Sequence, residues 1–410
     1  MKRIFLFSAF LVLLFSSAAQ TDVGYEIKVT FKPFKNQYIY LGHYFGKTYP
    51  IIDSALLNEK SEAIFKGDGN LNGGIYLIGY PKKTGFFEVL VDKQQRFSIT
   101  ADTATIGSSI KFENSSDNVL FNHYQQFMTG KGKEINKLKD SYKTSTSKKD
   151  SAAIREKLIK LDEDIAAFRN DIIKNYPGNI LTALLMTMKE PALTGRLKNP
   201  KTKEDSLASW QYYKDHFWDD VSFYDGRIAY TTFFEEKLDK YFNQVVVPHP
   251  DSVIKELDWM LGTATINLEM TRFLLIKFVN RYLNQKYMWE DAVFLYLFEK
   301  YFAQKEHSWL TAAGKKVITD RAYSLMANIM GTPASDIELP DSTGAMKSMF
   351  AEKGNFTMVI FWDPTCGHCK EVLPQIDSVY REKWKADSVN IYAVSKETKK
   401  KKKDWLNFIN

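Results

Sequence analysis

Both cysteines of this chain of 410 residues, Cys366 and Cys369, lie in one stretch near its C-terminal end, with His368 between them. An apolar run over residues 356–361 precedes them and predicts a buried strand, and apolar residues at helical spacing follow from Lys370 to Val379. The cysteines are therefore expected at a strand-to-helix turn. Unpaired backbone N–H groups and the helix dipole stabilise a thiolate at such a turn, and the thiolate is the form that attacks disulfides.

This placement predicts different roles for the two sulfurs. Cys366 lies at the start of the helix and is expected to be the acidic, exposed, attacking thiol. Cys369 lies one turn further in, is expected to be covered by the helix, and would be the resolving partner. A partly cationic His368 imidazole would add to the helix dipole and stabilise the dithiol form, which makes the pair more oxidising than one with proline at that position. The alternative is that His368 is a linker residue that faces solvent.

Two other interpretations of the cysteine pair are less favoured. A purely structural disulfide between Cys366 and Cys369 would close so short a loop that it would remove little chain entropy. A zinc site would need further ligands, and no second Cys or His pair in the sequence has ligand spacing. A lone Cys-x-x-Cys beside a predicted strand and helix therefore favours redox chemistry without a metal or another cofactor.

The stretch resembles the thioredoxin fold through its strand ending in Phe361 and Trp362, its Cys-Gly-His-Cys sequence, and a proline five residues beyond the second cysteine, Pro374. The lead-in over residues 331–344 is similar to the opening of exported TlpA/ResA-like thioredoxins. This resemblance implies a thiol–disulfide oxidoreductase that acts on thiols or disulfides of exported proteins and exchanges electrons with an upstream redox partner. It also implies that Trp362, Pro364, Gly367 and Pro374 support the cysteines.

The sequence departs from that family at three places. Ile360 stands where thioredoxin has a buried aspartate, and Val372 stands where TlpA/ResA-like proteins often have a glutamate; the neighbouring Glu371 should face another side of the helix. No proline occurs between Gln375 and Asn410, although thioredoxin folds place a cis-proline opposite the cysteines. We therefore expect the thioredoxin-like domain, residues 333–410, to be incomplete at its C-terminus and the chain to be a fragment or truncated product.

Two rival functions remain open. Peroxiredoxins share the fold, but they require a threonine three residues before the reactive cysteine and a proline seven before it, where this chain has Asp363 and Val359. The other rival is a partner-binding protein of the cell envelope whose redox domain is vestigial or truncated.

Composition bounds the broad class of the protein. The chain is 44% hydrophobic and 14% aromatic, which indicates a globular protein, and its length predicts two to three domains. The net charge of +7 includes Lys2 and Arg3, so the remainder carries 7 − 2 = +5. So small an excess over so long a chain does not indicate nucleic-acid binding.

The N-terminus has the three parts of a secretory signal peptide, predicted to span residues 1–19. Lys2 and Arg3 precede an apolar run over residues 4–15, and Ser17 and Ala19 occupy the small-residue cleavage positions. The protein is therefore expected in the periplasm or cell envelope, without lipid attachment, because no cysteine follows the run. No later segment has eighteen consecutive apolar residues, so no membrane span is expected in the mature chain, and nothing in the sequence indicates its oligomeric state.

Residues 22–112 alternate between apolar and polar residues and predict an all-β sandwich. Tyr25, Ile27, Val29 and Phe31 show this period of two, and turn-forming residues separate the later runs. We expect nothing catalytic in this domain. His43 is interpreted as a satisfied or solvent-facing histidine.

Residues 115–331 predict an all-α domain. One helix face carries apolar residues at steps of three and four, namely Ile154, Leu158, Leu161, Ile165, Phe168 and Ile172. That helix should end where Pro177 and Gly178 follow. Further helices are expected over residues 253–261, 267–283, 291–302 and 311–330.

The aromatic residues between Trp210 and Phe242 are interpreted as core, because their neighbours are acidic rather than basic. This stretch resembles the uncharacterised helical domain found before a TlpA-like thioredoxin in exported bacterial proteins. The basic run Lys399–Lys403 is interpreted as a solvated helix start, with contact to a membrane surface or an acidic partner as the alternative. The predicted architecture is thus β sandwich, helical domain and α/β thioredoxin-like domain in chain order.

Overall fold

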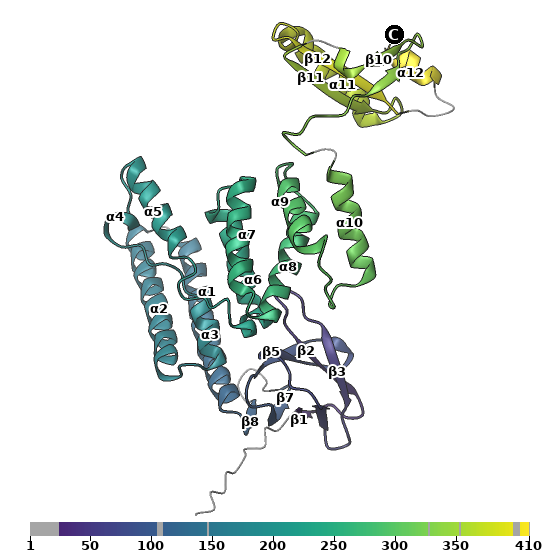
Figure 1. The fold of residues 1–410 in the computed structure, drawn as a ribbon. Coiled ribbons are helices and arrows are strands. Elements are labelled where there is room, and N and C mark those ends of the chain that lie inside the picture. The colour runs from purple at the N-terminus through teal and green to yellow at the C-terminus, as the bar shows by residue number, and fades with distance from the viewer. Residues whose placement is uncertain are drawn as a thin grey trace, which may run out of the picture. The chain divides into compact units, whose positions relative to one another are not determined.

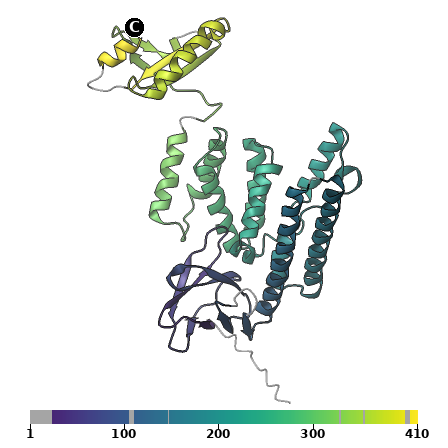
Figure 2. The same cartoon turned by 180° about the vertical axis from the view of Figure 1, so that it is seen from behind.

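The structure, a computed structural model, describes residues 24–104, 110–145, 147–326, 329–351, 354–396 and 402–409. The chain forms two compact units, residues 1–297 and residues 298–410. The predicted signal peptide, residues 1–19, and residues 399–401 of the predicted basic run lie outside the described residues. Figures 1 and 2 show the elements of each unit from opposite sides.

Among its described residues, the first unit begins with eight strands in two four-stranded sheets. The strands are β1 (Tyr25–Lys32), β2 (Tyr38–His43), β3 (Ile51–Leu56), β4 (Glu62–Gly67), β5 (Gly74–Gly79), β6 (Phe86–Val91), β7 (Arg96–Asp102) and β8 (Lys111–Glu113). One sheet has the order β4-β1-β7-β8 and the other has the order β3-β2-β5-β6. Strand β1 pairs antiparallel with β4 and parallel with β7.

Apolar residues at alternate strand positions build one core that both sheets share. In β1 the side chains of Ile27, Val29 and Phe31 are buried, as the period of two predicts. Strand β5 differs because Ile75 and Leu77 are buried as well as Tyr76 and Ile78. Both faces of β5 are therefore covered, and the short helical turn η2 (Gly226–Tyr230) contacts this strand.

Nine α-helices follow in the described part of the first unit. They are α1 (Ser116–Thr144), α2 (Lys148–Asn175), α3 (Ile180–Thr187), α4 (Gly195–Lys198), α5 (Lys203–Asp215), α6 (Thr232–Lys240), α7 (Pro250–Ala264), α8 (Leu268–Leu283) and α9 (Glu290–Leu297). Helices α1 and α2 run side by side as a long hairpin (Figure 1).

The sequence pattern explains where several of these helices begin and end. The side chains of Ser115 and Ser147 accept hydrogen bonds from backbone N–H groups in the first turns of α1 and α2. Helix α2 ends at Asn175, just before Pro177, and Leu161, Ile165 and Ile172 on its predicted apolar face are buried. Both predictions for this helix are confirmed.

Buried polar groups join the strands to the helices. Asn118 in α1 is fully buried, and its amide donates to the carbonyl of Leu90 at 2.8 Å and accepts from the N–H of Leu90 at 2.7 Å. Helix α1 thereby satisfies backbone groups of the edge strand β6. Gly74 approaches η2 so closely that an added Cβ would lie 2.2 Å from the Cβ of Tyr230. The first residue of β5 therefore needs to be glycine for close packing.

The second unit contains fewer buried side chains. Its elements are η4 (Phe298–Phe302), α10 (Ala312–Met326), β9 (Glu338–Pro340), β10 (Met346–Ser348), η5 (Met349–Ala351), β11 (Phe356–Trp362), α11 (Gly367–Val379), η6 (Tyr380–Trp384), β12 (Val389–Ser395) and α12 (Lys402–Ile409). Strands β9 and β10 pair antiparallel, and β11 and β12 pair parallel from Phe356 opposite Val389 to Trp362 opposite Ser395.

The expectation that residues 356–361 form a buried strand is half right. These residues do lie in strand β11, but Phe356 is 69% exposed and Phe361 is 71% exposed. Among the described residues β11 pairs with β12 alone, and helix α11 has no buried residue. Too few elements pack against this strand to bury its apolar side chains.

The chain thus has a β-rich N-terminal region, a helical central region and an α/β C-terminal region, in the predicted order. The aromatic stretch between Trp210 and Phe242 is largely core, as predicted, because Trp218, Phe223, Phe234 and Tyr241 are buried. In the parts of the chain that the structure describes, no helix has the length and apolar character needed to cross a membrane.

Candidate active site

A tight turn between β11 and α11 places Cys366 at the start of the helix. The carboxylate of Asp363 accepts hydrogen bonds from the backbone N–H of Thr365 at 2.8 Å and from its hydroxyl at 2.7 Å. The N–H of Cys366 donates to the carbonyl of Asp363 at 3.1 Å. Asp363 therefore holds the chain in an Asx-type turn that leads from the strand into the helix.

Cys366 is the N-cap residue of α11, with an extended backbone at φ −77° and ψ 121°. Its carbonyl accepts the N–H of Lys370 at 3.2 Å, the first hydrogen bond of the helix. Its sulfur lies where the first N–H groups of α11 have no partner within the helix. These groups lower the pKa of the Cys366 thiol, and the backbone N–H of Cys369 contributes most.

Two further groups lower the pKa of Cys366, and two effects raise it. Hydrogen bonds from the Cys369 thiol and from the backbone N–H of His368 also lower the pKa of Cys366, because they stabilise the thiolate. Partial desolvation and the negative charge of Asp363 raise it, but the net direction is downward. Both cysteines are free thiols.

The exposure of the two cysteines differs from expectation. The sequence predicts an exposed Cys366 and a Cys369 covered by the helix, whereas both are half-buried. Because no residue of α11 is buried, one turn of helix does not screen Cys369 from solvent. Backbone hydrogen bonding rather than burial therefore distinguishes the two thiols.

The other predicted site residues fall into two groups. Trp362 is 7% exposed and packs against Phe408 of α12 with ring centroids 4.8 Å apart, and Pro364 is buried as well. His368, Gly367 and Pro374 are exposed. Trp362 and Pro364 are thus packed beside the turn, whereas His368 is exposed beside the cysteines.

Pro374 lies inside α11 rather than at its end. It has no N–H, so the carbonyl of Lys370 loses its partner within the helix. Glu371 is exposed and Val372 is half-buried. Among the described residues no group of three or more His, Cys, Asp or Glu side chains is placed to hold a metal ion.

The roles of Asp363 and Phe408 were not predicted. Asp363 was interpreted only as a departure from the peroxiredoxin pattern, although an aspartate two residues before a threonine is a signal for this kind of turn. No local pattern indicates that Phe408 covers Trp362, because the two residues are far apart in the sequence.

Comparisons with known proteins match the helical region and the C-terminal region separately. Residues 330–409 match the AhpC/TSA family, and residues 189–328 match a domain of unknown function, DUF5106. None of the curated proteins matches the chain. Among solved structures, the chain is similar to a thioredoxin-like protein from Bacteroides caccae, with 15% sequence identity, a TM-score of 0.37, and coverage of 55% of this chain and 78% of that one.

The family match includes strand β11, both cysteines and helix α11. The C-terminal region is therefore similar to the AhpC/TSA family over the segment that holds the cysteine pair.

Proposed function

We propose that the protein is a thiol–disulfide oxidoreductase that cycles Cys366 and Cys369 between the dithiol and the disulfide. The observation that carries this proposal is the position of Cys366 at the N-cap of α11, where backbone N–H groups and the neighbouring thiol lower its pKa. A lowered pKa increases the thiolate fraction near neutral pH, and the thiolate is the nucleophile in exchange. The thioredoxin-like domain around the pair supports redox chemistry.

The reaction proceeds in two exchanges. The Cys366 thiolate attacks one sulfur of a substrate disulfide, forming a mixed disulfide and releasing the other substrate sulfur as a thiolate, which takes up a proton. Cys369 then loses its proton and attacks the Cys366 sulfur, which releases the second substrate thiol. The substrate disulfide is reduced by two electrons and the cysteine pair is oxidised, and the reverse sequence oxidises a substrate dithiol.

The proposed substrates are thiols or disulfides of exported proteins in the periplasm or cell envelope, with a separate redox partner that restores the cysteine pair. The signal-like N-terminus and the resemblance to TlpA/ResA-like thioredoxins support this assignment. The half-buried cysteines also support it, because a folded protein substrate needs an accessible sulfur.

A thiol peroxidase is the second candidate, and the match to the AhpC/TSA family favours it. The residue three positions before Cys366 argues against it. Asp363 stands where peroxiredoxins have threonine, and its negative charge raises the pKa of Cys366 and so opposes the thiolate.

Insulin reduction by dithiothreitol tests the proposal, with hydrogen peroxide consumption measured in parallel. We expect the protein to accelerate insulin reduction, Cys366→Ser to abolish the acceleration, and Cys369→Ser to accumulate a mixed disulfide with the substrate. Peroxide consumption that depends on Cys366, without faster insulin reduction, would identify the peroxidase instead. If neither activity appears, the redox proposal fails and the partner-binding alternative is favoured.

A further inference from the structure

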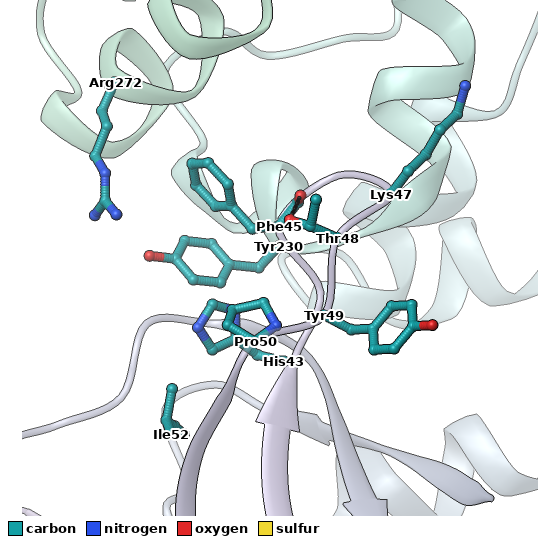
Figure 3. Close-up of a pocket in the computed structure, with 9 residues that line it drawn as sticks. All are labelled: His43, Phe45, Lys47, Thr48, Tyr49, Pro50, Ile52, Tyr230 and Arg272. Atoms are coloured by element: carbon teal, nitrogen blue, oxygen red, sulfur yellow. Dashed lines mark hydrogen bonds between the residues drawn. The ribbon is translucent and has the colours of Figure 1, made fainter. Parts of the chain in front are cut away.

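A pocket of about 750 Å³ lies in the first unit where the β2–β3 loop meets the helices (Figure 3). Its walls include His43, Phe45 and Ile52 from the β-rich region, and Tyr230 and Arg272 from the helical region. This volume is in the range of sites that hold small organic molecules. No sequence motif predicts a binding site at these residues.

Aromatic rings line much of the pocket. The ring centroids of Tyr230 and His43 are 5.0 Å apart, and those of Tyr230 and Phe45 are 5.7 Å apart in an edge-on arrangement. Phe45 also packs edge-on against Phe273, with centroids 5.1 Å apart. These mutual contacts fix the rings, so the apolar wall exists before any ligand binds.

Arg272 adds a cation whose hydrogen-bonding capacity is mostly unused. Its guanidinium carbon lies 5.3 Å from the centroid of the Phe45 ring, which holds the side chain in place. Its contact with a Glu269 carboxylate oxygen is long, at 3.5 Å, and that same oxygen already accepts the Tyr230 hydroxyl at 2.6 Å. The Nε atom of Arg272 is buried and has no hydrogen-bond partner among the described residues. Leaving such a donor unpaired costs free energy, which an incoming acceptor would recover.

Figure 3 shows the guanidinium directed toward the side of the pocket where Tyr230, His43 and Ile52 lie. Lys47 also lines the pocket, but its ammonium points away and pairs with Asp239. No lining residue is acidic. The pocket therefore offers one directed positive group over an apolar wall.

The imidazole of His43 is compatible with that description. The Nδ1 atom of His43 lies 2.8 Å from the carbonyl of Tyr44, an arrangement that requires the proton on Nδ1. Burial lowers the pKa of His43, and the positive charge of Arg272 acts in the same direction. His43 therefore serves as a neutral ring in the wall, and Arg272 supplies the charge.

The loop that forms this pocket depends on a glycine. Gly46 has φ +57°, and an added Cβ would lie 1.9 Å from a Glu235 carboxylate oxygen that accepts the N–H of Lys47 at 2.6 Å. Lys277 pairs with the same carboxylate at 2.7 Å. The loop is thus anchored to α6 and α8, which keeps the pocket walls together.

We propose that this pocket binds a small organic carboxylate that carries an apolar or aromatic group. The carboxylate pairs with the guanidinium of Arg272, whose fork geometry suits two parallel hydrogen bonds, and the apolar group packs against Phe45 and Tyr230. This assignment is independent of the cysteine chemistry.

Calorimetric titration of the full chain with three carboxylates, phenylacetate, indole-3-acetate and octanoate, tests the proposal, with phenylacetamide as an uncharged control. We expect saturable binding of at least one carboxylate at a single site and binding of phenylacetamide at least about ten times weaker. Arg272→Gln should weaken the carboxylate by about ten-fold or more.

Two further variants keep the test decisive if Arg272→Gln fails to fold. Ile52 is 43% exposed at the rim, so Ile52→Glu introduces a repelling charge without disturbing the core and should also abolish binding. Lys143→Gln removes an exposed cation that does not line the pocket and should leave the affinity unchanged. The proposal is wrong if none of the carboxylates binds, if phenylacetamide binds as tightly, or if Ile52→Glu binds normally.

Discussion

The junction between strands and helices in the first unit and the cysteine turn in the second unit use polar groups in opposite ways. At the junction, Arg227 donates to Asp92 at 2.7 Å and to Asp225 at 2.7 Å, and all three side chains are mostly buried. At the turn, the cysteines are half-buried on a helix without a buried residue. Paired, desolvated groups hold the first unit together, whereas the second unit leaves its reactive groups accessible.

This contrast predicts that damage to the junction destabilises the fold without changing the thiols. Arg227→Met keeps much of the side-chain volume but leaves Asp92 and Asp225 as poorly compensated carboxylates. We expect the free energy of unfolding of the first unit to fall by about 2–4 kcal/mol. This loss is smaller than that for a fully buried broken ion pair, because the site is partly solvated.

Urea denaturation followed by tryptophan fluorescence measures this loss, and the alkylation rate of Cys366 at low urea is the second readout. Lys143→Met, which removes an exposed ion pair with Asp140, is the matched control and should change stability little. A changed alkylation rate in folded Arg227→Met would contradict the expectation that damage to the junction leaves the thiols unchanged.

The second prediction concerns the chemical difference between the two cysteines. At pH 7 Cys366 should be alkylated by iodoacetamide at least about ten times faster than Cys369, because its pKa is lowered by backbone N–H groups of α11. Cys369→Ala should raise the pKa of Cys366 only slightly, since it removes one thiol hydrogen bond and keeps the backbone ones. Mass spectrometry after brief labelling of the reduced protein decides the order, and faster labelling of Cys369 would reverse the assigned roles.

The third prediction is that His368, an exposed side chain at the turn, changes the reduction potential of the cysteine pair. If its imidazole stabilises the reduced form, His368→Pro should lower the reduction potential by about 30 mV, which corresponds to about 1.4 kcal/mol for two electrons. His368 is exposed, so the substitution does not disturb buried packing. Equilibration of both proteins with glutathione buffers measures the difference. An unchanged or raised potential means that His368 does not stabilise the dithiol form.

The smallest effect is expected at Lys237, a buried cation of the first unit. It is 8% exposed, donates to the carbonyl of Lys189, and lies 4.8 Å from the Phe217 ring centroid. Burial lowers its pKa to about 8 from 10.5, so between those values the unfolded chain binds more protons than the folded one. The free energy of unfolding contributed by Lys237 therefore rises with pH in this window and is constant below it.

Urea denaturation at pH 7.5 and pH 9.0 detects this contribution when the wild type is compared with Lys237→Met. We expect the wild type to gain about 1 kcal/mol more than the variant over this interval. Equal changes in the two proteins would show that Lys237 is charged and well solvated in the folded state, which would contradict the view that desolvated groups hold the first unit together.

Local patterns in the sequence predicted what depends on near neighbours. The strand period predicted the alternation in β1, and the helix breakers predicted the end of α2 before Pro177. The change from strand to helical spacing predicted the cysteine turn after residue 361. Exposure of Phe361 could not be predicted in this way, because it depends on which strands flank β11. The pocket was missed for a similar reason, since His43 and Arg272 meet only through the packing of distant elements.

The most direct test of the central claim is the oxidation equilibrium of Cys366 with Cys369. The protein is equilibrated in buffers of varied glutathione redox ratio, quenched in acid, alkylated and analysed by mass spectrometry of the peptide that contains both cysteines. We predict a single two-electron transition from a doubly alkylated peptide to an internal disulfide, with no transition to an internal disulfide in Cys366→Ser or Cys369→Ser. Two cysteines that stay reduced, or that acquire glutathione independently, would contradict the assignment of a redox-active pair.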